Sequence, residues 1–106
     1  MSDNERAQLE QDERARIAER DRAHRANVIL KDDLVRDALQ AIRDEAWRMF
    51  NEAKPNDADA LQLARLKYLV AEDFANELIR HVTTGEMAVQ QLTWIQKQLA
   101  RLRKAA

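Results

Sequence analysis

The sequence predicts an all-α protein, and three observations support this fold class. The 106 residues include 18 Ala and 12 Leu, which favour helices, but one Gly and one Pro, too few for the turns of a many-stranded sheet. Apolar side chains recur every three or four residues over most of the chain. Charged residues make up 35% of the sequence, as expected for a helical protein in water. We expect a helical hairpin plus a third helix, similar to a three-helix bundle, with helices at about 33–54, 57–83 and 86–103.

Residues 1–27 form a charged segment with few large apolar side chains. After the initiator methionine, only Leu9 and Ile17 could enter a core. Three of its acids precede a base by four residues, a spacing that stabilises a helix by about 0.2–0.5 kcal/mol per pair. We therefore expect a charged N-terminal arm or solvated helix outside a helical domain at 28–106. Deleting residues 1–26 should then leave thermal stability almost unchanged.

The helix predicted at 33–54 has clear signals at both ends. Asp32 and Asp33 are natural N-cap residues. Pro55 stops the helix because proline disfavours helical backbone at the preceding residue and donates no backbone hydrogen bond. The short linker predicts that the next helix folds back antiparallel beside this one.

The helix predicted at 57–83, capped by Asn56 or Asp57, has apolar residues on most of its sides. Its most regular stripe consists of Leu61, Ala64, Tyr68, Ala71, Ala75, Leu78 and Val82. A second apolar row consists of Leu63, Leu66, Leu69, Val70 and Phe74. Such a pattern is typical of a helix that is buried on more than one side. We expect this helix to be central in the fold or to form a subunit interface.

A turn is expected between the second and third helices. Gly85 suits a left-handed C-terminal cap, and Thr84 can cap the helix that follows. The third helix carries a narrow apolar stripe formed by Ala88, Leu92, Ile95, Leu99 and Leu102. A narrow stripe packs against one groove or one partner helix.

The sequence contains no recognisable catalytic, metal or cofactor site. It has no cysteine, and its single glycine cannot build a phosphate-binding loop. Glu77 and His81 lie four residues apart on one helix, but a zinc site usually needs at least three protein ligands. We therefore expect a protein that is not an enzyme. No secretory signal and no run of about 20 apolar residues is visible, so we expect no membrane span.

Two sets of residues are candidates for binding. Trp47 and Trp94 lie at or beyond the edge of their stripes, which fits either partial burial at the edge of the fold or an anchor for a partner. The candidate oligomer or partner interface consists of Trp47, Leu61, Tyr68, Leu78, Val82, Leu92, Trp94 and Leu99. The last twenty residues contain four bases and no acid. These bases either complement the dipole of a terminal helix or make weak phosphate contacts; they are Lys97, Arg101, Arg103 and Lys104.

Part of the chain resembles a known group of proteins. The resemblance is carried by Leu30-Lys31-Asp32-Asp33-Leu34, Ala38, Ile42, Trp47, a linker with Asp57, the Leu66 and Leu69 pair, and Gly85 with Ala88. These residues resemble a loose group of short helical proteins of tailed bacteriophages and prophages, encoded near virion-assembly genes. The resemblance spans just over half of the chain and implies a helical hairpin. It also implies a location in the bacterial host cytoplasm or in the virion.

The leading hypothesis is a non-enzymatic assembly or interaction protein. It would act as a homo-oligomer, together with another protein, by burying helical stripes. The resemblance implies a virion-assembly or virion-associated role. The alternative is a small helical regulator that binds nucleic acid weakly or inhibits a host protein.

Overall fold

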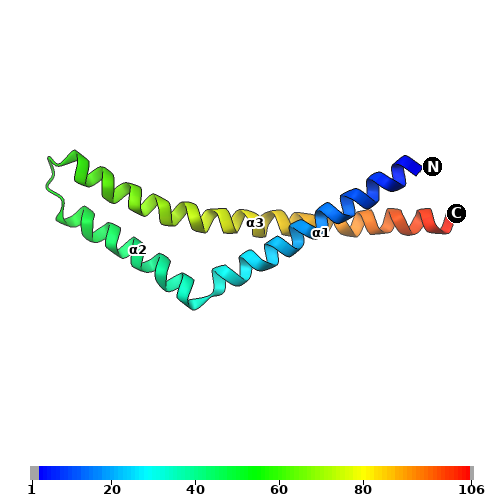
Figure 1. The fold of residues 1–106 in the computed structure, drawn as a ribbon, viewed down its shortest axis with the longest axis horizontal. Helices are drawn as coiled ribbons and strands as arrows, with labels where there is room; N and C mark the ends of the chain where they lie inside the picture. Colours follow the sequence, from blue (N-terminus) through cyan, green and yellow to red (C-terminus); the bar gives the residue numbers. More distant parts are fainter. Residues whose placement is uncertain (1–2, 106) are drawn as a thin grey trace. The chain divides into compact units, whose positions relative to one another are not determined.

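The computed structural model describes residues 3–105, and all regular structure in this range is helical (Figure 1). The helices are α1 (Asp3–Lys31), α2 (Asp33–Glu52) and α3 (Ala58–Ala105). The predicted all-α fold class is confirmed for these residues. The first two residues of the predicted arm and the last residue of the chain lie outside the described residues.

The described residues form two compact units, and α3 contributes to both. The hairpin unit, residues 28–78, contains the last four residues of α1, the whole of α2 and the first part of α3. The terminal unit consists of residues 3–27 and 79–105, in which most of α1 packs with the second part of α3. The structure thus groups the chain differently from the predicted arm at 1–27 and single domain at 28–106.

The hairpin unit is confirmed as two helical segments joined by a short linker (Figure 1). Asp32 caps α2 by accepting a hydrogen bond from the backbone N–H of Val35 at 3.1 Å. Asp57 caps α3 in the same way through the N–H of Ala60, also at 3.1 Å. Each cap is one of the two candidates that the sequence offered, Asp32 or Asp33 for α2 and Asn56 or Asp57 for α3. α2 ends at Glu52, two residues before the predicted end, because Ala53 is already extended ahead of the Lys54-Pro55 pair.

The predicted turn at residues 83–86 is absent, and the expected second and third helices are one helix, α3. Gly85 has no positive φ, so it forms no left-handed cap. The Thr83 hydroxyl donates a hydrogen bond to the carbonyl oxygen of Ile79 at 3.1 Å, which accommodates threonine inside the helix. Because the chain does not turn here, the expected separate third helix of a three-helix bundle is not formed.

The sequence carries a signal for this continuous helix. Counting Gly85 as an inward position joins the two predicted stripes, whose residues then follow one another three or four apart with one irregular step after Gly85. The joined stripe is Leu61, Ala64, Tyr68, Ala71, Ala75, Leu78, Val82, Gly85, Ala88, Leu92, Ile95, Leu99 and Leu102. A seam of this period is typical of one helix that packs along a single line.

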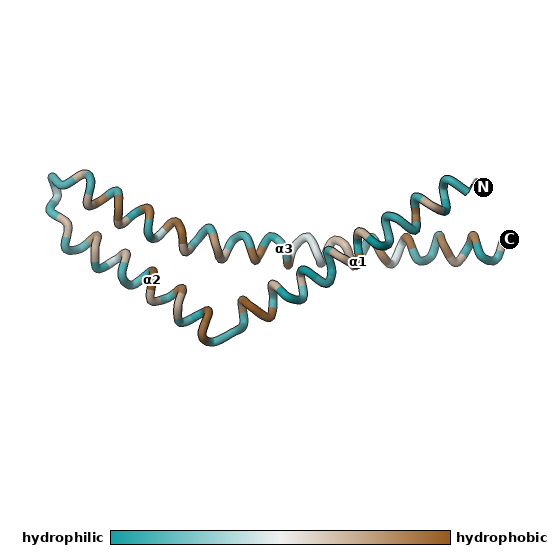
Figure 2. The backbone as a smooth tube through the Cα atoms, in the orientation of Figure 1, coloured by the Kyte–Doolittle hydropathy of each residue, from teal (hydrophilic) through white to brown (hydrophobic). Residues whose placement is uncertain are grey.

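The charged N-terminal segment is helical and covers the second part of α3. α1 is mostly hydrophilic (Figure 2), yet Ala88, Leu92, Ile95 and Leu99 are all buried in the unit that it forms with α3. Arg16 of α1 donates a hydrogen bond to the Gln91 side-chain oxygen of α3 at 2.8 Å. The predicted narrow stripe therefore does pack against one partner helix, and that helix is α1.

α1 and α3 approach each other closely at Gly85. A Cβ atom at this position would overlap the Cβ of Ala23 and lie 3.3 Å from the backbone carbonyl oxygen of Glu19. Gly85 is thus required for close helix packing and not for a turn. Its cost inside a helix, about 1 kcal/mol relative to alanine, is offset by the packing that it permits.

Gly85→Ala should destabilise the terminal unit. In an exposed helix this change adds about 1 kcal/mol of stability, but here the added methyl overlaps Ala23, and overpacking costs about 1–3 kcal/mol. The free energy of unfolding, measured by denaturant titration, should fall, and the double variant with Ala23→Gly should recover much of the loss. A Gly85→Ala variant as stable as the native chain would contradict the close packing.

Deleting residues 1–26 should lower thermal stability, in contrast to the expectation from sequence. The deletion uncovers Leu92, Ile95 and Leu99, and each large apolar side chain contributes about 1.5–3 kcal/mol when buried. Circular dichroism should show an earlier melt and helix loss beyond the deleted residues. The matched control is deletion of residues 1–8, because residues 3–8 are exposed; that change should have little effect.

Candidate functional site

The hairpin unit contains an apolar cleft of about 460 Å³. We define the apolar cleft by its lining residues, which are Ala46, Trp47, Phe50, Ala58, Leu61, Gln62, Ala64, Arg65 and Tyr68. The rings of Trp47 and Phe50 meet edge to face, with centroids 5.9 Å apart, and form its wall on α2. The volume and the apolar lining fall in the range of ligand and side-chain binding pockets.

Small buried residues contribute to the lining of this cleft on both helices. Ala46 of α2 and Ala64 of α3 are 3% and 2% exposed and lie at its base. Alanine does not fill the space between the helices, so the larger Trp47 and Tyr68 remain at the opening, 58% and 38% exposed. The linker holds the end of the hairpin closed through a hydrogen bond from the Asp57 N–H to the Lys54 carbonyl oxygen at 2.9 Å.

Among residues 3–105, Arg43 and Glu72 form an ion pair between the two helices, whereas the nearby Arg65 forms none. The Arg43 Nε donates a hydrogen bond to Glu72 at 2.6 Å, and both side chains are about one-third exposed or less. Arg65 also lies on α3 and is exposed at the cleft. It has no hydrogen bond or ion pair with any residue that the structure describes. The cleft therefore offers apolar surface beside an available guanidinium.

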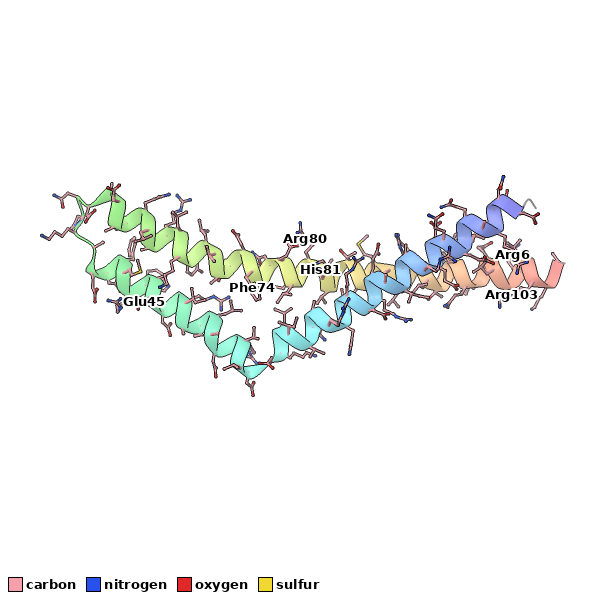
Figure 3. The ribbon with its side chains drawn as sticks, viewed as in Figure 1. Arg6, Glu45, Phe74, Arg80, His81 and Arg103 are labelled. Carbon is pink, nitrogen blue, oxygen red and sulfur yellow. The ribbon has the colours of Figure 1, made fainter. Side chains whose placement is uncertain are left out.

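A second apolar surface, the outer row, lies on α3 away from the cleft. It consists of Leu63, Leu66, Val70 and Phe74, which are 58%, 49%, 65% and 49% exposed. At 100° per residue, these four fall within about 80° of one another and point about 170° away from the cleft side of the helix. The sequence predicted that this row would be covered, but no part of the described chain buries it. Figure 3 marks Phe74 on α3.

The predicted interface residues lie in four different places. Trp47, Leu61 and Tyr68 line the apolar cleft. Leu78 and Val82 are half-buried on the seam of α3. Leu92 and Leu99, at 4% and 3% exposed, are core residues of the terminal unit, so a partner cannot reach them. Trp94 is 59% exposed and lines a shallow, more polar hollow with Asp12, Arg16, Gln90, Gln91 and Ile95.

Phe50 and Arg65 were not among the binding residues predicted from the sequence. Phe50 was detectable, because it lies three residues after Trp47 and such residues are neighbours on a helix surface. Arg65 was not detectable from the sequence. Its availability for binding depends on the absence of a nearby carboxylate in the folded unit, and the spacing of residues along one helix does not show this.

The basic cluster lies at the exposed end of α3, but acids of α1 belong to the same unit. Lys97, Arg101, Arg103 and Lys104 are all exposed. The first residues of α1 carry Asp3, Glu5, Glu10, Asp12 and Glu13, and Figure 3 shows Arg6 of α1 and Arg103 of α3 at the same end of this unit. Folding therefore brings negative charge to a cluster that is unopposed along the sequence.

The described residues supply no metal centre and no membrane-crossing helix. Within residues 3–105, no three His, Cys, Asp or Glu side chains gather closely enough to hold a metal ion. None of the helices in this range is both long and apolar enough to cross a bilayer.

Three charged side chains, Glu45, Arg48 and Glu52, form a triplet on the face of α2 that points away from the cleft. Arg48 donates hydrogen bonds to Glu45 and to Glu52, the latter at 2.6 Å. The hydrogen bond from Arg48 lowers the pKa of Glu45, with a smaller contribution from Lys67 on α3. The same two carboxylates raise the pKa of Arg48 above its usual value. Figure 3 marks Glu45 on α2.

Arg48→Gln should raise the pKa of Glu45. The sign follows from linkage: a carboxyl whose pKa is lowered on folding stabilises the fold above its unfolded pKa, about 4.3 for Glu, and the contribution is lost as the pH falls through the lower folded value. NMR titration of the side-chain carboxyl should show a lower midpoint in the native chain than in the variant. Equal midpoints would contradict the pairing.

No protein-family model, curated protein or solved structure matches this chain. The resemblance of residues 30–88 to helical phage proteins therefore stays a prediction from sequence. The function has to be argued from the surfaces of the two units.

Proposed function

We propose that this protein is a non-enzymatic helical assembly protein that acts as a homo-oligomer through its hairpin unit. The proposal depends on one observation: every buried residue of this unit is an alanine. These residues are Ala46, Ala64, Ala71 and Ala75. The large apolar side chains of the same unit are half-buried or exposed, including those of the apolar cleft and the outer row.

This distribution of side chains favours association. Covering one large apolar side chain contributes about 1.5–3 kcal/mol, and the outer row alone offers four of them on one helix face. Contiguous exposed apolar patches are typical of protein interaction sites. A second copy of the chain brings the same surfaces at the same concentration, so self-association is the simplest way to cover them.

We further propose that the protein acts in virion assembly or as a virion-associated accessory protein, in the bacterial host cytoplasm or the virion. The support for this setting is the resemblance of residues 30–88 to short helical phage proteins. Other partner proteins would join the assembly through surfaces that self-association leaves open. The alternative role in nucleic-acid binding is not favoured, because α1 brings acids to the basic cluster.

Light scattering tests the proposal on the full chain. The native protein should have a mass that is a whole multiple of 12.3 kDa, and its melting temperature should rise with concentration. Leu66→Lys combined with Val70→Lys should lower the mass and remove the concentration dependence, because it places two cations in the outer row.

Leu34→Lys is the matched control. Leu34 is 78% exposed in the same unit but lies outside the cleft and the outer row. This variant should keep the native mass. A native chain that is monomeric at every concentration would overturn the proposal.

A further inference from the structure

We infer that the apolar cleft of one copy receives the outer row of a second copy, so that copies associate head to tail. This inference rests on the proposed self-association and specifies its geometry. Both surfaces lie in the hairpin unit, and each is apolar with charged groups at its edge. An amphipathic helix that lays one apolar face into a groove is a common mode of protein recognition.

The two surfaces match in length. The lining of the cleft on α3 runs from Ala58 to Tyr68, which corresponds to about 15 Å of helix at 1.5 Å per residue. The outer row runs from Leu63 to Phe74, which corresponds to about 16.5 Å. The row can therefore lie along the full length of the cleft, with its large side chains directed towards the aromatic wall of Trp47 and Phe50.

The two surfaces also have complementary charges. Arg65 lies in the cleft, and Asp73 lies beside Val70 and Phe74 of the outer row. Both side chains are exposed, and neither makes a hydrogen bond or ion pair with another residue in the described range. Opposite charges across an interface favour the correct partner and fix its register.

This charge pair selects the direction of docking. If the row is centred on the cleft and the two copies of α3 run parallel, Arg65 lies opposite residues 70–71, within one turn of Asp73. If they run antiparallel, Arg65 lies opposite residues 66–67 and meets the positive charge of Lys67. The parallel arrangement is therefore favoured.

Head-to-tail docking has a consequence for assembly. The cleft and the outer row lie on opposite sides of α3, so a copy that uses its cleft still offers its row. A contact between two different surfaces is heterologous, and it continues into a ring or an open chain of copies. A symmetric contact between two rows would end at a dimer.

A mixing experiment separates these geometries. Trp47→Lys disables the cleft, and Leu66→Lys with Val70→Lys disables the row; all three residues are about half exposed, so the fold should tolerate the changes. Each variant alone should be monomeric by light scattering. An equimolar mixture should form a heterodimer of twice 12.3 kDa, because one copy retains the row and the other retains the cleft.

A charge exchange provides a second test that does not depend on Trp47. Arg65→Glu and Asp73→Arg should each weaken self-association about tenfold, because each places like charges together. The double variant should recover most of the native affinity, since the pair is restored with its signs reversed. Circular dichroism at low concentration confirms that every variant is helical.

The outcomes distinguish this inference from the proposed function. An oligomer that persists in the Trp47→Lys and Arg65→Glu variants would overturn cleft-to-row docking and leave self-association standing. A native chain that is always monomeric would overturn both. A mixture that forms no heterodimer, or a double variant weaker than either single variant, would also overturn the docking geometry.

Discussion

The structure depends on one packing line along α3. From Leu61 to Leu102 its inward residues follow one another three or four apart, and most of those at the closest contacts are Ala or Gly. Small residues allow helix backbones to approach closely, as at Gly85, where even a methyl group would overlap Ala23. In the terminal unit this line also holds Leu92, Ile95 and Leu99, which α1 covers. In the hairpin unit the buried residues of this line are alanines, whereas its large residues Leu61, Tyr68 and Leu78 are half-buried or exposed.

Much of the fold could be predicted from the sequence because its signals are local. Asp32, Asp57 and Pro55 act within a few residues of their own positions, and the helix starts that they specify appear as expected. The prediction of a turn at Gly85 was wrong because a glycine fits two different structures. It suits a left-handed cap, and it also permits close helix packing. Only the contact with Ala23, 62 positions earlier in the chain, decides between them.

The packing of α1 on α3 could not be predicted from local sequence signals either. Residues 3–27 contain only Leu9 and Ile17 as large apolar residues, so they cannot form a core by themselves. They pack nevertheless because α3 supplies the large side chains, while α1 supplies small ones such as Ala23 and Ala26 and the aliphatic parts of longer residues. The cleft was partly predictable: Trp47, Leu61 and Tyr68 were identified by spacing, whereas the partnerless state of Arg65 depends on which carboxylates the fold brings near it.

The two units use the same helix for different purposes. Where α1 covers α3, Leu92, Ile95 and Leu99 are buried and form the core of the unit. Where α2 covers α3, the buried residues are alanines such as Ala46 and Ala64, and Trp47, Phe50 and the outer row remain exposed. Covering these side chains by association would therefore add free energy that a single chain leaves unused. The small residues at the seam thus support the proposed function in assembly.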